Sequence, residues 1–219
     1  PGTARQPGAI WESNGTLLET MLRALGQSVT QRRVVADQPD ALRQALLDLA
    51  HDCDVVVSTG GVSAGDTDWI RPLVAELGAV DFWKLFLRPG RPFAFGSIGE
   101  GVPFFGLPGN PVAAAVTALQ LLWPALQVLE GQSEPELFPR VMVELADPLP
   151  RRPGRPELAR ARLETNAAGT LLARVDGSQA SSRIGSLQHA DLLLELPAEA
   201  STLENGTRLW AQVIRQRIF

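Results

Sequence analysis

The segment Ser58–Gly65 has the residue types of an anion-binding loop. Gly60, Gly61 and Gly65 free the backbone to turn tightly and to direct its N–H groups toward one point, and Ser63 adds a hydroxyl group. The helix expected after the loop would contribute its positive N-terminal end. The segment is therefore a candidate phosphate-binding loop, although an ordinary glycine-rich turn between a strand and a helix has the same pattern.

Carboxylates surround this loop in the sequence. Asp66 and Asp68 follow it directly, and Asp37 comes at the end of an earlier apolar stretch. Acidic groups beside a phosphate site suit a divalent cation, because hard cations prefer oxygen ligands. The alternative is that Asp66 or Asp68 caps the next helix.

A second candidate is cationic. Lys84 is the only lysine among 20 basic residues, and Arg88 follows four positions later. On a strand over residues 80–87 and into the next turn, the two side chains would share one face. Together they could hold an oxyanion, with lysine as a point charge and arginine as a planar fork. The alternative is a solvated basic face on an edge strand.

Two turns are expected to begin helices. Pro108, Gly109 and Asn110 precede Pro111, which predicts a rigid turn with Asn110 as N-cap and proline in the first helical turn. Asn14 is expected to N-cap an earlier helix in the same way. Either asparagine could instead contact a ligand.

The elements that position these residues alternate between helix and strand up to residue 137. Helical periodicity follows Asn14 and Pro39, strands are expected over 29–36 and 54–58, and shorter strands follow residue 80. This order predicts a three-layer α/β domain over residues 1–137 with a mostly parallel sheet. Residues 138–219 instead alternate in short runs between turns, which predicts an antiparallel β domain, either a small barrel or a sandwich.

Composition excludes several classes of protein. The chain has 219 residues and a net charge of −4, without the basic surface that nucleic-acid binding requires. Cys53 is the single cysteine, so an internal disulfide is impossible. The longest apolar run, over 112–126, is expected to be interrupted by Pro124 and to be too short for a membrane span. Because the chain begins at Pro1 in turn-forming residues, we expect it to be part of a longer polypeptide.

The candidate motifs occur together, in one order, in a known family. They are Ser13-Asn14, Ser58–Gly65 with Asp68, Phe82-Trp83-Lys84 with Arg88-Pro89-Gly90-Arg91-Pro92-Phe93, and Gly106–Val112. The chain resembles the C-terminal two domains of the molybdopterin molybdotransferases, the MoeA and gephyrin E-domain family. The likeness is specific over about residues 8–131. It is weaker over the β domain, where Pro153-Gly154-Arg155 and 179–186 carry it.

The resemblance implies a molybdopterin-binding α/β domain followed by a small β-barrel. It also implies an enzyme that inserts molybdate into adenylylated molybdopterin and releases AMP, with help from Mg²⁺ or another divalent cation. The site residues would divide by role: Asp37 and Asp68 near the pyrophosphate and the metal, Lys84 and Arg88 on molybdate or phosphate, and Gly60, Gly61, Ser63, Gly65, Pro108, Gly109, Asn110, Arg155 and Ser181 on the cofactor.

The chain departs from the family pattern in places. The family's Thr-Gly-Asp-Glu-Leu segment would precede residue 1, so a first strand and one carboxylate are expected to be missing and the fragment by itself to be inactive. Ala180 and Ser182 stand where the family has glycines. The resemblance implies a cytoplasmic homodimer when full length, with no nucleic-acid or membrane partner. The alternatives are a molybdopterin adenylyltransferase-type domain of the same fold and a non-catalytic scaffold module.

Overall fold

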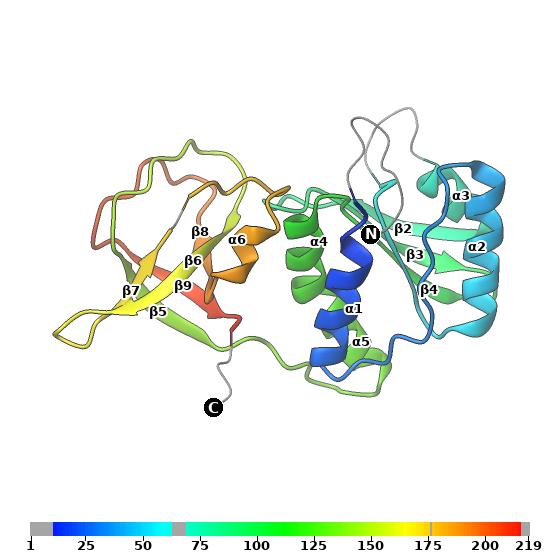
Figure 1. Cartoon of the computed structure of the whole chain (residues 1–219), viewed down its shortest axis with the longest axis horizontal. Helices are drawn as coiled ribbons and strands as arrows, with labels where there is room; N and C mark the ends of the chain where they lie inside the picture. Colours follow the sequence, from blue (N-terminus) through cyan, green and yellow to red (C-terminus); the bar gives the residue numbers. More distant parts are fainter. Residues whose placement is uncertain (1–10, 63–68, 176, 216–219) are drawn as a thin grey trace. The chain divides into compact units, whose positions relative to one another are not determined.

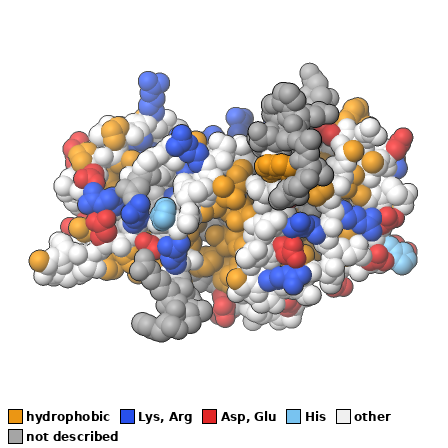
Figure 2. All heavy atoms as spheres, in the orientation of Figure 1, with side chains coloured by type: hydrophobic (Ala, Val, Ile, Leu, Met, Phe, Trp, Pro, Cys, Tyr) orange, Lys and Arg blue, Asp and Glu red, His pale blue; other side chains and the backbone are white. Residues whose placement is uncertain are grey.

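The chain forms two compact units. In the computed structural model, which describes residues 11–62, 69–175 and 177–215, the α/β unit comprises Pro1–Trp83 and Pro92–Ala118, and the barrel unit comprises Lys84–Arg91 and Leu119–Phe219. Figure 1 traces the chain, and Figure 2 shows the same face with its charged side chains. Because each unit draws on two stretches of the chain, a single cut does not separate them. The division into domains 1–137 and 138–219 stays a prediction.

A four-stranded sheet forms the centre of the α/β unit. Its strands are β1 (Val56–Thr59), β2 (Gly78–Lys84), β3 (Pro92–Ile98) and β4 (Val102–Leu107), in the order β1-β4-β3-β2. β1 pairs with β4 in parallel, whereas β3 and β4 are antiparallel. The sheet is mixed because the β3–β4 connection is a three-residue turn, and a turn this short joins only antiparallel neighbours.

Helices cover both faces of this sheet, as the sequence predicts. They are α1 (Asn14–Ala24), α2 (Pro39–Asp52), α3 (Ile70–Leu77) and α4 (Pro111–Thr117). Figure 1 shows α2 and α3 on one side of the strands and α1 and α4 on the other. The core between sheet and helices includes Val56, Ile98 and Phe104, which are 3% exposed or less. The three-layer α/β architecture is therefore confirmed.

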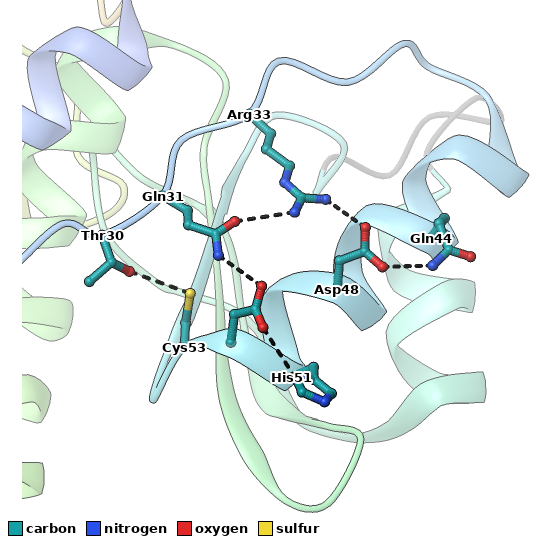
Figure 3. Close-up of polar contacts among 8 residues, drawn as sticks. Thr30, Gln31, Arg33, Gln44, Asp48, His51 and Cys53 are labelled. Atoms are coloured by element: carbon teal, nitrogen blue, oxygen red, sulfur yellow. Dashed lines mark hydrogen bonds and ion pairs between the residues drawn. The ribbon is translucent and has the colours of Figure 1, made fainter.

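The strand expected over residues 29–36 does not form. This segment, like Asp37 after it, has no strand assignment in the structure, and β1 is the last strand on its side of the described sheet. Its side chains are bound to α2 and the residue after it: Gln31 to Asp52, Arg33 to Asp48, and Thr30 to Cys53 (Figure 3). Polar side-chain bonds, instead of a backbone ladder, therefore hold the segment in place.

The barrel unit contains a closed five-stranded barrel. The strands are β5 (Arg140–Leu145), β6 (Glu157–Thr165), β7 (Leu171–Arg174), β8 (Leu192–Leu196) and β9 (Arg208–Val213), in the order β5-β7-β6-β8-β9. A short helix, α6 (Gly185–Gln188), precedes β8. Alternating residues fill the interior, with Leu192 and Leu194 fully buried.

The predicted antiparallel pairing is found at four of the five strand contacts of the barrel. The exception is β5 with β7, which run parallel. A ring with an odd number of strands cannot alternate direction all the way round. Closing five strands therefore requires at least one parallel pair.

The apolar run around Pro124 continues as one helix, contrary to the interruption expected. α4 passes into a π-helical turn at Ala118–Leu122 and then into α5 (Trp123–Leu129). Pro124 directly follows the π-helical turn as the second residue of α5, and the helix continues past it. By length and composition the helix Pro111–Leu129 could cross a membrane, but most of it (61%) is buried within the structure, as in the core helix of a folded domain.

Candidate functional site

Two of the predicted loops touch each other at the carboxyl ends of β1 and β4. Thr59 and Leu107 are paired in parallel, so the loops that follow them leave the sheet side by side. The Gly60 N–H donates to the Leu107 carbonyl at 3.1 Å. A Cβ at Gly109 would lie 3.4 Å from the Gly60 Cα. The backbones of the two glycine turns are therefore close together. A side chain at position 109 would occupy the space between them.

The turn at Gly60 and Gly61 uses the conformational freedom of glycine. Both residues have positive φ, 78° and 67°, a region that L side chains rarely adopt. Ser63, Gly65 and Asp68, which the sequence places in and after this loop, lie outside the described residues.

The Asn14 side chain adds a third motif to this corner of the α/β unit. Its Nδ2 donates to the Gly109 carbonyl at 2.8 Å, and the residue is buried. The expected N-cap role is wrong, because Ser13 occupies the N-cap position of α1 and Asn14 opens the helix itself. Asn110 is at the N-cap position of α4, but its side chain makes no capping hydrogen bond. It is exposed beside buried Pro108.

Ser58, the first residue of the predicted anion-binding segment Ser58–Gly65, was given no role of its own in the sequence analysis. Its Oγ is buried, yet it has no hydrogen-bond partner in the part of the chain that the structure describes. Ser58 pairs with Gly106 in the sheet, directly before the glycine turn. Buried hydroxyls are ordinarily satisfied, so an unpaired one at the end of a strand is a natural contact for a ligand oxygen. The sequence signal for a ligand contact at Ser58 is its position directly before Thr59-Gly60-Gly61.

Lys84 and Arg88 do not share the face of one strand. β2 ends at Lys84, which is exposed, and Arg88 is placed by the barrel unit instead. The Arg88 N–H donates to the Pro156 carbonyl at 2.9 Å, and the Leu158 N–H donates to the Arg88 carbonyl at 2.8 Å. These bonds form an isolated bridge between Arg88 and Glu157. The predicted common face is therefore wrong, because Arg88 pairs with a second strand that the local pattern could not reveal.

Glu157 is the acidic partner of the segment Lys84–Arg91, which is called the cationic loop below. Its carboxylate lies 3.5 Å from Arg88 Nη1, and its side chain is only 9% exposed, against 57% for Arg88. The sequence analysis passed over Glu157, although it stands two residues after the predicted Arg155. A carboxylate buried so deeply holds Arg88 to β6 and fixes the direction of its guanidinium.

Arg155 also contacts the loop. Its Nη1 donates to the Leu87 carbonyl at 2.9 Å. Arg155 therefore contacts the segment that carries Arg88, although the two arginines lie in different parts of the sequence. Arg160 lies farther along β6. Burial lowers the pKa of the Arg160 guanidinium, the charge of Glu157 works against this shift, and Arg88 adds to it. Arg88, Glu157 and Arg160 therefore form one electrostatic cluster.

The remaining predicted residues are not joined to these groups by a described contact. Asp37 is exposed in the bend before α2, and Ser181 is partly buried in the loop before α6. No group of three His, Cys, Asp or Glu side chains with metal-binding geometry occurs in the described ranges. The residues present therefore do not by themselves make a Mg²⁺ site, and Asp68, the second predicted ligand, is outside those ranges.

Two family models match the chain. The probable molybdopterin binding domain covers residues 2–128, and the MoeA C-terminal region, domain IV, covers residues 142–213. The molybdopterin molybdenumtransferase of Haemophilus influenzae is 30% identical over 94% of this chain and 50% of its own length. The molybdenum cofactor synthesis protein cinnamon of Drosophila melanogaster is 34% identical over 92% of the chain and 33% of its own length.

Solved structures agree with these matches. A crystal structure of a molybdopterin biosynthesis MoeA protein from Pyrococcus horikoshii superposes with a TM-score of 0.81 at 25% identity, covering 99% of this chain and 51% of that one. The chain thus spans between a third and about half of the length of these relatives. The chain belongs to the molybdopterin-binding domain family, in the MoeA and gephyrin group that carries the MoeA C-terminal region.

Proposed function

We propose that this chain is the substrate-binding part of a molybdopterin molybdotransferase. The reaction takes adenylylated molybdopterin and molybdate, breaks the bond between the pterin phosphate and the adenylyl group, and leaves molybdenum at the dithiolene with release of AMP. The observation that carries the proposal is the corner at the ends of β1 and β4, where the Gly60 and Gly109 backbones meet beside the buried, unpaired Ser58 hydroxyl. Backbone groups at such a position suit a phosphate.

In this proposal the corner where the Gly60 and Gly109 turns meet binds the pterin phosphate. Gly60 and Gly61 leave room for the phosphate to approach the backbone, and Asn14 fixes the facing turn through the Gly109 carbonyl. Ser63, Gly65, Pro108 and Asn110 are proposed to complete the binding surface.

The cationic loop supplies the charge that a polyanionic substrate needs. Lys84 is exposed, and its ammonium group is proposed to contact molybdate or phosphate oxygens. Arg88 forms an ion pair with Glu157. Its guanidinium is therefore proposed to contact the substrate in an orientation that this ion pair sets. Arg155 supports the same loop through Leu87, and Ser181 is proposed as a further contact. Preorganised charge of this kind is the usual means of catalysis in phosphoryl chemistry.

A divalent cation such as Mg²⁺, held by Asp37 and Asp68, is part of the proposal, although the described residues do not assemble a site for it. Bound there, it would neutralise the charge of the pyrophosphate. The proposed setting is cytoplasmic, in a homodimer when full length, without nucleic acid or membrane.

The test is AMP release from adenylylated molybdopterin, with and without molybdate, by the full-length protein that carries this chain. Lys84→Ala is expected to abolish the molybdate-dependent release. Arg208→Ala, which removes an exposed arginine of β9, serves as the matched control and is expected to keep it. Full molybdate-dependent release by Lys84→Ala would overturn the role of Lys84. Adenylyl transfer from ATP to molybdopterin, without molybdate-dependent AMP release, would point to the adenylyltransferase alternative.

A further inference from the structure

Phe86 lies in the middle of the cationic loop, and its side chain is exposed. The residue is 71% exposed, whereas the next most exposed aromatic residues among the side chains that the structure describes, Trp11 and Trp210, reach 44%. Phe86 makes no ring-stacking or cation–π contact with any residue in the described ranges. Its ring therefore contributes little to the packing of the barrel unit.

The backbone on both sides of Phe86 is held in place. The Leu85 N–H donates to the Arg91 carbonyl at 3.0 Å, and Arg155 Nη1 donates to the Leu87 carbonyl at 2.9 Å. Leu85 and Leu87 are partly buried, whereas Phe86 is exposed at the bend between them. Because the backbone is already fixed, a ligand that contacts the ring has only the side-chain torsions of Phe86 to order.

Cations are the neighbours of Phe86 in this loop. Lys84, Arg88 and Arg91 are exposed, and the loop contains no acidic residue. A single exposed apolar side chain is ordinary on a protein surface, but this one lies two residues from each of two cations that are proposed to contact the substrate. A ligand that fits these groups has oxyanions for the cations and a flat apolar surface for the ring.

We propose that Phe86 is a specificity-determining contact for the pterin, whose ring system stacks on the phenyl ring. This inference rests on the molybdotransferase function proposed above, in which Lys84 and Arg88 contact molybdate or phosphate oxygens. Molybdenum is left at the dithiolene, which is bonded to the pterin ring system, whereas the adenine lies beyond the phosphates. The ring nearest to the bound molybdate is therefore the pterin. Stacked aromatic rings gain free energy beyond the burial of their apolar area.

The test is steady-state AMP release by the full-length protein that carries this chain, at saturating molybdate and varied adenylylated molybdopterin. Phe86→Ala is expected to raise the KM about tenfold and to keep kcat within about twofold, because a stacking contact made equally in the ground state and the transition state is lost. Phe86→Tyr keeps the flat ring and is expected to keep the KM. Phe86→Leu is apolar without a flat ring, and its KM is expected to rise as in Phe86→Ala.

The matched control is Leu137→Ala, because Leu137 is 74% exposed on the same unit and lies outside the cationic loop. This variant is expected to keep the KM of the unaltered protein, and Phe86→Ala is expected to keep its melting temperature. The inference would be overturned by an unchanged KM in Phe86→Ala, by an equal rise in Phe86→Tyr, or by an equal rise in Leu137→Ala.

Equilibrium binding of molybdopterin and, separately, of AMP gives a second readout that does not depend on turnover. Weaker binding of molybdopterin by Phe86→Ala, with unchanged binding of AMP, supports the pterin contact. The reverse result would assign the ring to adenine and overturn the inference. A change in oligomeric state of Phe86→Ala, measured by light scattering, would overturn it by placing the ring in a contact between subunits.

The two proposals fail in different ways. If the unaltered protein neither binds molybdopterin nor releases AMP, the molybdotransferase proposal is wrong and the role of Phe86 is wrong with it. If the unaltered protein does both and Phe86→Ala does so equally well, only the role of Phe86 is wrong.

Discussion

Replacing Glu157 by Gln tests whether a buried carboxylate fixes the cationic loop on the barrel. The substitution keeps the shape of the side chain, replaces one acceptor oxygen by an NH2 donor, and removes the charge. Arg88 would then lose its ion-pair partner, and the buried Arg160 would lose the charge of Glu157, which favours its ionised form. We therefore expect the barrel unit to become less stable and Arg88 to become less ordered.

The size of the effect follows from the exposure of the two partners. A fully exposed ion pair contributes about 0.2–1 kcal/mol, whereas breaking a buried pair costs about 3–5 kcal/mol. The Glu157 side chain is 9% exposed and Arg88 57%, so the pair lies between these limits. We expect a loss of about 1–3 kcal/mol in the free energy of unfolding. For a unit of about 100 residues this lowers the melting temperature by roughly 4 °C or more.

The matched control is Glu164→Gln, the same change on the same strand. Glu164 pairs with Arg174 at 2.8 Å, but both side chains are more than one-third exposed and solvent screens their charges, so the loss of stability is expected to be clearly smaller than in Glu157→Gln. Scanning calorimetry compares the two variants. Hydrogen exchange then checks the amide of Arg88, which is expected to exchange faster in Glu157→Gln alone. Equal destabilisation by both variants, with unchanged exchange at Arg88, would refute the reasoning.

Three further predictions concern the α/β unit. Asn14→Ala is expected to cost about 1–2 kcal/mol in urea unfolding, because the Gly109 carbonyl loses its donor; no loss would show that solvent replaces it. Gly96→Ala is expected to cost about 3 kcal/mol or more in thermal unfolding, because its Cβ would overlap the Ala79 carbonyl oxygen of β2; a normal melting temperature would contradict this close approach of the two backbones. Hydrogen bonds from Arg33 and Gln31, respectively, lower the pKa of Asp48 and Asp52 below 3.8, so their contribution is present above that pH and lost as acid protonates them. The hydrogen-exchange protection factors of residues 29–36, which correct for the slower intrinsic exchange of amides in acid, should fall below that pH. A matching fall at neutral pH in an Asp48→Asn/Asp52→Asn variant would confirm the cause, and unchanged protection in acid would contradict it.

Local patterns in the sequence predicted much of the architecture correctly. Apolar periodicity placed α1 and α2, and prolines marked the first turns of α2 and α4. These features depend on residues close in the chain, so they are visible without tertiary structure. The parallel β5–β7 pair was not predicted, because it follows from the closure of a five-stranded barrel, which only the tertiary structure shows.

The wrong predictions concern residues whose structure depends on partners far away in the sequence. Residues 29–36 have the composition of a strand, but their side chains found acidic partners at the end of α2 instead of a strand ladder. Arg88 was expected to continue β2, and it pairs with Glu157 instead. Asn14 was expected to cap its own helix, and its amide bonds to a turn 95 residues away. In each case a long-range bond replaced the local one that the pattern favoured.

The sequence by itself determined the family, the two kinds of unit and the residue types available for an anion: glycine turns, one lysine, and clustered arginines. The tertiary structure decided which of these meet. Parallel pairing of β1 with β4 brings the Gly60 and Gly109 turns into backbone contact. Docking of residues 84–91 on β6 gives Arg88 a buried carboxylate, and the loop before α6 hydrogen-bonds to the backbone of the buried Arg160. The reason is physical: residue type sets the charge that a site can offer, whereas burial and the neighbours that folding supplies determine whether that charge is neutralised or left for a ligand.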